Sequence, residues 1–208
     1  MRSLTLALTL LIAPLAIAVE DGFISLWDGK TFGGWKASEN KGTFTIKDGA
    51  LVAQGKRSHL FYVGDVNGGK FKNFELKVDV KAQENSNGGI YFHTQYQEVG
   101  WPDHGFEVQV NNTHKDRRKT GGLYAVADVM DTPPAKDYEW FTEHIIVKGN
   151  HVVIKVDGKT TADWTQPEGW QGAHNMPLRK IRNGTIALQG HDPVSVVHFK
   201  NIRIKPRP

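Results

Sequence analysis

The chain has 208 residues, of which 39% are hydrophobic and 23% charged, with a formal net charge of +4 at pH 7 and no cysteine. So small and interspersed a charge excess argues against nucleic-acid binding, and the absence of cysteine excludes disulfides and thiolate metal sites. Roughly 190 residues beyond a leader suffice for one domain with a sizeable core, to which six Trp and ten Phe contribute.

The chain opens with an apolar run, Leu4–Ala18, that follows a basic residue and ends in small residues. This pattern is typical of a secretory signal peptide, residues 1–18, because the run is too short for a comfortable membrane span. We therefore expect a single mature domain, residues 19–208, that is exported to the periplasm or the extracellular space and keeps no membrane span. An uncleaved anchor is the alternative.

From Phe23 onward, short runs of alternating apolar and polar residues are separated by turn residues, without a linker or repeat. Longer strands are expected at Asn73–Lys81 and Val194–Lys205, the second with a bulge near Asn201. Hairpin turns are expected at dipeptides that tolerate positive φ, namely Asp48-Gly49, Gly149-Asn150 and Asp157-Gly158. This rhythm predicts an all-β fold, a two-sheet antiparallel jelly-roll sandwich with one concave face.

The segment from Gln166 to Arg182 is the longest one without strand character, and it is rich in Gly and Pro. Long loops in compact domains are often functional. Trp170 and His174 are therefore candidates to cover a pocket, although a Trp packed on the edge of the sandwich is the alternative.

Three expected strands carry side chains that bind ligands or transfer protons. Side chains alternate between the two faces of a strand, so the outer faces are expected to present Glu107, Gln109 and Asn111 (strand 106–111), Tyr91 and His93 (strand 88–93), and Gln189 and His191 (strand 186–191). An ordinary solvated face is the alternative, but such a face carries mainly Lys, Glu, Thr and Ser. The three faces therefore predict one converging site.

Short motifs recur in a fixed order over nearly the whole mature chain. They are Gly22–Lys30, Gly34-Trp35, Phe44–Leu51, Phe74–Leu76, Asn87–Phe92, Gly105–Val110, Thr120–Tyr124, Glu139-Trp140, Gly184–His191 and Val197–Lys205. By the order and spacing of these motifs, the chain resembles the 3-keto-disaccharide hydrolase domain family, whose fold is concanavalin A-like. Departures lie at Gly88, where the family usually has Ser, at His93, where Arg is common, and near Asn111 and Asn112, where an acidic residue is frequent.

The resemblance implies a hydrolase for glycosides whose carbon 3 hydroxyl has become a ketone. The ketone acidifies the proton on carbon 2, so a base can remove it, the enolate can expel the aglycone from carbon 1, and water adds back. Such a route needs a base, a group that stabilises the enolate oxygen, and an acid.

These roles are assigned as hypotheses. Either His191 or Glu107 is the base, and the other is the acid or orients the imidazole. The expected sugar ligands are the polar residues His93, Gln109, Asn111 and Gln189 and the aromatic residues Tyr91, Tyr124 and Trp140. Pairing of Glu107 with Arg117 or a nearby Lys, a surface-turn role for His191, and core packing of Tyr124 and Trp140 are the structural alternatives.

Other functions remain open from the sequence. A non-catalytic, lectin-like glycan-binding module uses a similar polar and aromatic face. A β-glucanase needs two carboxylates on one strand, and the strand that begins at Phe106 supplies only Glu107. The partner is in each case a sugar or glycoside. The sequence assigns no cofactor. A divalent metal at Glu107, His93 or His191 is an alternative, although the chain lacks any His-x-x-x-His spacing, and the oligomeric state is not predicted.

Overall fold

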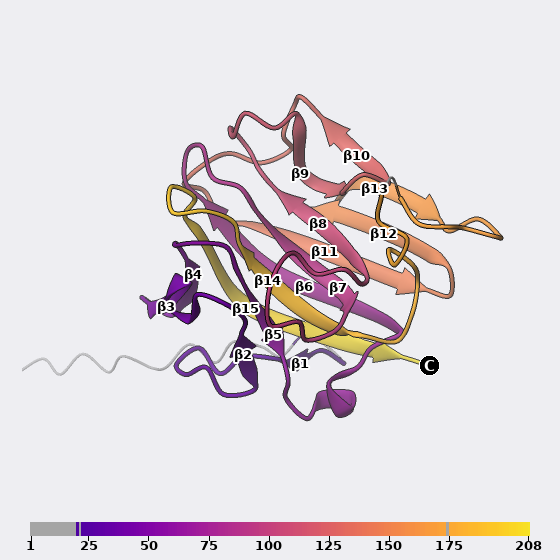
Figure 1. Cartoon of the computed structure of the whole chain (residues 1–208), viewed down its shortest axis with the longest axis horizontal. Helices are drawn as coiled ribbons and strands as arrows, with labels where there is room; N and C mark the ends of the chain where they lie inside the picture. The colour runs from indigo at the N-terminus through magenta and orange to yellow at the C-terminus, as the bar shows by residue number, and fades with distance from the viewer. Residues whose placement is uncertain (1–19, 21, 174) are drawn as a thin grey trace, which may run out of the picture.

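The computed structural model describes residues 20, 22–173 and 175–208, so the predicted signal peptide and His174 lie outside the described residues. Within this part of the chain, two antiparallel sheets form the molecule, with two short 3-10 helices, η1 (Lys41–Thr43) and η2 (Val66–Gly69), in the connections. Figure 1 shows the sheets lying one over the other. The predicted all-β sandwich is confirmed. A search of the described residues finds no helix with the length and apolar character of a membrane span.

One sheet has eight strands in the described part of the chain, in the order β13-β12-β11-β6-β15-β4-β3, and β1 pairs with β15 beside this path. The strands are β1 (Ile24–Ser25), β3 (Phe44–Lys47), β4 (Ala50–Ala53), β6 (Asn73–Ala82), β11 (Phe141–Lys148), β12 (His151–Val156), β13 (Lys159–Thr165) and β15 (Val197–Arg207). The three predicted hairpin turns join β3 to β4, β11 to β12 and β12 to β13. Asp48 and Gly49 both have positive φ, at 51° and 68°, as the tight turn requires.

The other sheet has seven strands among the described residues, in the order β10-β9-β8-β7-β14-β5-β2. The strands are β2 (Trp35–Ala37), β5 (Ser58–Tyr62), β7 (Gly88–Thr94), β8 (Phe106–Val110), β9 (Arg118–Leu123), β10 (Ala127–Met130) and β14 (Thr185–Gly190). The middle of this sheet therefore brings β14, late in the chain, between β7 and β5, with β8 on the far side of β7 (Figure 1).

The core lies between the sheets and follows the predicted alternation. In β6, Phe74, Leu76, Val78 and Val80 are fully buried and alternate with partly exposed polar residues. Burial of each such side chain stabilises the fold by about 1.5–3 kcal/mol. The period of β15 shifts between Lys200 and Arg203, and Asn201 has a φ of 48°, which confirms the predicted bulge.

The outer face of the seven-stranded sheet is also buried at its centre. All the residues of β7, β8 and β14 are buried, including the polar ones that face away from the core. Strands buried on both faces need a cover on the outer side. Residues of the segments 101–103 and 175–179 share a pocket lining with this face, and they supply part of that cover.

Candidate active site

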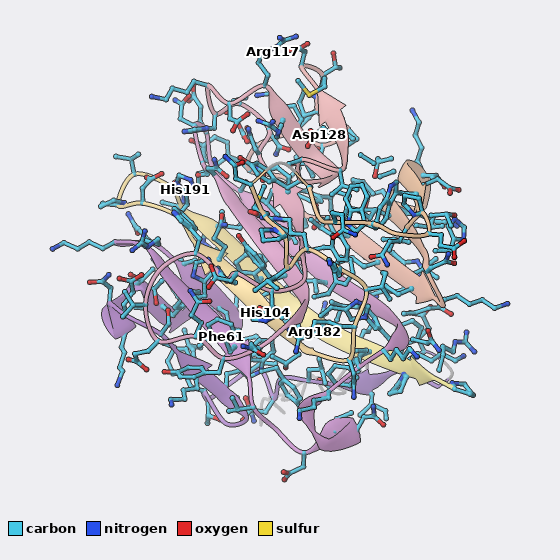
Figure 2. The ribbon with its side chains drawn as sticks, turned by 45° about the vertical axis from the view of Figure 1, so that its right-hand side comes forward. Phe61, His104, Arg117, Asp128, Arg182 and His191 are labelled. Carbon is cyan, nitrogen blue, oxygen red and sulfur yellow. The ribbon has the colours of Figure 1, made fainter. Side chains whose placement is uncertain are left out.

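A pocket of about 600 Å³ lies on the outer face of the seven-stranded sheet. Strands β7, β8 and β14 supply its floor, and the segments 101–103 and 175–179 supply its walls. Of the residues predicted from the sequence, the lining contains Tyr91, Glu107, Gln109, Tyr124, Gln189 and His191. In Figure 2, His191 lies at the end of β14, where that strand leaves the sheet.

Glu107 is the centre of a hydrogen-bonded cluster on the pocket floor, and its side chain is nearly buried. The Tyr91 hydroxyl donates to Oε2 at 2.8 Å, and Nε2 of Gln189 donates to Oε1 at 2.8 Å. Nη2 of Arg179 lies 3.6 Å from Oε2. Burial raises the pKa of Glu107, while Arg179 and the two donors partly offset that rise. The predicted alternative of pairing with Arg117 is wrong, because Arg117 pairs with Asp131.

A glycine beside Glu107 leaves room for this cluster. Gly89 pairs with Gln109 in the β7–β8 ladder, two positions from the Tyr91 and Glu107 pair and on the same face. A Cβ on Gly89 would lie 2.6 Å from Oε1 and 2.9 Å from Cγ of Glu107, closer than real contacts allow. Glycine at position 89 therefore leaves the space that the Glu107 side chain occupies.

His191 has one ring nitrogen fixed by a carboxylate. Its Nδ1 lies 2.7 Å from Oδ2 of Asp192. Burial raises the pKa of Asp192, but hydrogen bonds from His191 and Ser195 outweigh this and hold that pKa below its usual value. An ionised Asp192 only accepts, so it selects the tautomer with the proton on Nδ1 and leaves the Nε2 lone pair for proton transfer.

Two amides on the floor keep oxygen atoms available. Nε2 of Gln109 donates to Oδ1 of Asn87 at 2.9 Å, whereas Oε1 of Gln109 has no partner among the described residues. Oε1 of Gln189 is also buried without a partner in that part of the chain. Buried polar atoms are normally satisfied, so these two oxygens suit the hydroxyl donors of a sugar.

The structure does not bring His93 into the pocket. A register shift between Thr185 and Ala187 interrupts the β7–β14 ladder, and His93 has a φ of 56°. This irregularity turns the ring away from the side of Tyr91 and places it against Phe74 and Phe92, with Nε2 2.8 Å from the Lys72 carbonyl oxygen. Burial lowers the pKa of His93 to about 4. The strict alternation predicted for this strand is wrong here.

Asn111 and Trp140 also lie outside the pocket lining. Asn111 donates to the carbonyl oxygens of Asp116 and Arg118, at 3.0 and 2.7 Å, so it shapes the loop between β8 and β9. Trp140 precedes β11 of the other sheet. The ammonium group of Lys200 lies over the Trp140 ring, 3.9 Å from the ring centroid. Neither residue is placed to contact a ligand bound beside Glu107.

The pocket also contains residues that the alternation did not reveal. Trp101 stands at the rim, 41% exposed, with its ring centroid 5.1 Å from that of His191. Arg179 comes from the loop 166–182, in which Trp170 packs on Trp164 at 5.3 Å and donates from Nε1 to the Arg179 carbonyl oxygen at 2.8 Å. Trp170 therefore anchors the wall of the pocket. The sequence signal was the length of the loop, which carries no information on which side chain enters the site.

No group of three His, Asp or Glu side chains among the described residues is arranged to hold a metal ion. The alternative of a divalent metal at Glu107, His93 or His191 therefore finds no group of three such ligands in that part of the chain.

Taken together, the fold and the pocket define a concanavalin A-like sandwich with a polar and aromatic hollow of the size of a small carbohydrate. A family model described as the 3-keto-alpha-glucoside-1,2-lyase-like domain matches residues 22–205. The chain belongs to this family, which confirms the resemblance seen in its motifs. The membership supports a carbohydrate hydrolase.

One named relative and two solved structures are similar to this chain. A 3-keto-disaccharide hydrolase of Bacteroides thetaiotaomicron is 27% identical, over 89% of this chain and 78% of its own length. A candidate glycosyl hydrolase from Parabacteroides distasonis has a crystal structure that matches with a TM-score of 0.75 at 24% identity, over 90% of this chain and 94% of that one. The carbohydrate-binding module CBM66 of Bacillus subtilis matches with a TM-score of 0.59 at 14% identity, over 83% and 95%. The two structures show the shared fold.

Proposed function

We propose that this protein cleaves 3-keto-glycosides, 3-keto-disaccharides among them, by proton abstraction at carbon 2, elimination and rehydration. The observation that carries the proposal is the convergence of a buried carboxylate, Glu107, and a carboxylate-held imidazole, His191, in one pocket. The family membership and the named relative from Bacteroides thetaiotaomicron support the same chemistry.

The reaction has three steps. A base removes the carbon 2 proton, the C–H electron pair forms a carbon 2–carbon 3 double bond, and the ketone oxygen becomes an enolate. The enolate then re-forms the ketone, a carbon 1–carbon 2 double bond forms, and the C1–O bond breaks as the leaving oxygen takes a proton. Finally, water adds its hydroxyl to carbon 1 and its proton to carbon 2, which gives a free 3-keto sugar and the aglycone alcohol.

His191 is the proton-transfer residue in this scheme. Its Nε2 is the free basic nitrogen, because Asp192 holds Nδ1, and positioned acid–base groups contribute about 10²- to 10⁴-fold to the rate. Glu107 orients Tyr91 and Gln189 and balances the charge of Arg179. The rings of Trp101 and Tyr124 contact the apolar face of the sugar.

Export is a further part of the proposal. The apolar run that ends at Ala18 would direct the chain to the periplasm or the extracellular space, and cleavage would leave residues 19–208. Intact-mass measurement of the protein from its native host tests this, and an N-terminus that still carries the apolar run would contradict it.

The activity is tested by incubating purified protein with 3-keto-trehalose, 3-keto-lactose and a 3-keto-glucoside, with and without chelator. His191→Asn is expected to lower turnover by about 10²- to 10⁴-fold, because it removes the proton-transfer group. Glu107→Gln is expected to lower turnover because it removes the carboxylate that orients Tyr91 and Gln189 and faces Arg179. The far-UV CD spectrum is expected to be unchanged in both variants. His151→Asn is the matched control, because His151 forms a similar pair with Asp163 at 2.7 Å on the other sheet. Equal rates in wild type and both site variants would remove the assignment.

Glycan binding without turnover is the second candidate. The aromatic pair at the pocket, Trp101 and Tyr124, suits sugar recognition in the absence of chemistry. This function predicts that wild type binds the disaccharides and forms no product, and that Glu107→Gln keeps the same affinity.

A further inference from the structure

Arg179 brings a guanidinium into the pocket wall, and most of its hydrogen-bonding capacity is unused. The residue is 5% exposed, and Nη1 has no partner among the described residues. Nη2 is 3.6 Å from Glu107 Oε2, longer than a hydrogen bond, and Nε faces the sulfur of Met176, a weak acceptor. Burial of a charged donor without acceptors is unfavourable. An oxygen from a ligand would complete this site.

A purely structural ion pair does not explain this geometry. Arginine and carboxylate side chains that serve only each other commonly form two parallel bonds of about 2.7–2.9 Å. Here Oε1 of Glu107 is bonded to Gln189 and Oε2 to Tyr91, so both oxygens have their own donors. Glu107 balances the charge of Arg179, and the N–H groups of Arg179 can still donate to a ligand.

The backbone on either side of Arg179 fixes where the guanidinium lies. The Arg179 amide donates to the Met176 carbonyl oxygen at 3.2 Å, and its own carbonyl oxygen accepts from Trp170 at 2.8 Å. The guanidinium centre lies 5.4 Å from the centroid of the Tyr124 ring. A donor held in this way before the substrate arrives needs little reorganisation when charge develops, which is the condition for strong electrostatic catalysis.

We propose that Arg179 is the catalytic residue that binds the carbon 3 oxygen of the substrate. This inference rests on the proposed function, and it names the group that the enolate step requires. As the carbon 2 proton leaves and the C–H pair moves into the carbon 2–carbon 3 bond, the ketone oxygen gains the negative charge, and Nη1 and Nη2 donate to it. When the C1–O bond breaks, the same oxygen becomes a ketone again and the two bonds weaken.

The test compares wild type with Arg179→Gln, Arg179→Lys and Arg179→Ala in steady-state hydrolysis of 3-keto-trehalose between pH 6 and pH 9. Arg182→Gln is the matched control, because Arg182 comes from the same loop and lies toward the other end of β14 from His191 (Figure 2), where it contacts Gln95. Guanidinium chloride at millimolar concentration is added to Arg179→Ala, with sodium chloride at the same ionic strength as the reference. Thermal unfolding of each variant reports whether the fold persists.

We expect Arg179→Gln to lower kcat by about 10²- to 10³-fold with a small change in KM, since the interaction forms in the transition state. The Lys variant retains a part of the activity, guanidinium partly restores the Ala variant, and Arg182→Gln matches wild type. Removal of Arg179 also raises the pKa of Glu107, so the defect must persist at pH 9. Recovery at high pH would show that Arg179 acts only through the ionisation of Glu107 and would overturn the inference.

The failure of this inference is distinct from the failure of the proposed function. Turnover by wild type together with kcat within threefold of wild type in Arg179→Gln would overturn the role of Arg179 alone. Absence of turnover by wild type on every 3-keto-glycoside would overturn the proposed function and this role with it.

Discussion

Tyr91 and Glu107 face each other directly across the β7–β8 ladder, and the tyrosine hydroxyl donates to the carboxylate at 2.8 Å. Both side chains are buried, so each ties the other to one position. Burial raises the pKa of both groups, and the hydrogen bond favours the form in which Glu107 is ionised and Tyr91 is protonated. The hydrogen bond therefore opposes the effect of burial on the carboxyl and fixes the pair at the floor of the pocket.

Tyr91→Phe is expected to destabilise the protein by about 1–3 kcal/mol at pH 7, because a buried carboxylate loses a donor. The pKa of Glu107 rises further without that donor, so the loss is smaller at pH 4, where the carboxyl is mostly protonated in both the folded and the unfolded state. Urea unfolding at the two pH values measures this. Tyr138→Phe, at a 61% exposed position, is the control, and an equal loss in both variants would contradict the expectation.

Gly89→Ala is expected to displace Glu107, because the new Cβ would lie 2.6 Å from Oε1. Overpacking of this kind costs about 1–3 kcal/mol, and we expect turnover to fall by at least tenfold as Tyr91 and Gln189 lose their common acceptor. Steady-state kinetics with chemical denaturation check both effects. Gly42→Ala is the control, since no atom lies within 4 Å of its added Cβ. Full activity of the Gly89 variant would show that the cluster tolerates movement.

Trp101→Ala is expected to weaken sugar binding by about two- to tenfold, the equivalent of an aromatic contact of about 0.5–1.5 kcal/mol. Trp140→Ala is matched to it, because Trp140 has a similar exposure, 37% against 41%, on the other sheet. Isothermal titration with an unoxidised disaccharide gives the two affinities. Equal affinity in both variants would show that the sugar does not reach the rim of the pocket.

Glu143 provides a pH-dependent stability term away from the pocket. It is fully buried in β11, and neither carboxylate oxygen has a hydrogen-bond partner in the described part of the chain. Burial raises the pKa of Glu143 to about 8, and the nearby Gly121 amide, although it does not meet the geometry of a hydrogen bond to the carboxylate, opposes that rise. The unfolded chain releases this proton near the ordinary value of 4.5, so between these values the folded state binds more protons and stability falls as the pH rises.

Glu143→Gln is therefore expected to remove a slope of up to about 1.4 kcal/mol per pH unit between pH 5 and pH 8. Urea unfolding of wild type and variant at half-unit intervals gives the difference, in which the other titrating groups cancel. A difference that does not change with pH would show that Glu143 ionises normally inside the core.

The sequence predicted the parts of the site that depend on strand periodicity alone. Glu107, Gln109 and Gln189 lie where strict alternation places them, on strands that pair regularly around them. His93 departs from this pattern because its backbone takes a left-handed conformation at a register shift, and nothing in Tyr91-Phe92-His93 indicates that shift.

Strand periodicity does not predict the conformation of loops or the sheet to which a strand belongs. Arg179 lies in the pocket wall because Trp170 donates a hydrogen bond to the Arg179 carbonyl oxygen and so fixes the fold of the 166–182 segment. This is a tertiary contact, and no local sequence repeat indicates it. The aromatic character of Trp140 suits a sugar ligand, but alternation fixes only the face of a strand. It does not show which of the two sheets the neighbouring strand β11 joins.

Because Trp170 anchors the wall of the pocket, the stability of the sandwich and the position of the Arg179 side chain depend on different contacts. Cleavage of the backbone between Trp170 and Arg179 would leave both sheets and Glu107 intact. The Arg179 guanidinium, however, would no longer be held in place by the chain that joins it to Trp170. A protein nicked there should remain folded, still recognise its ligand, and turn it over slowly.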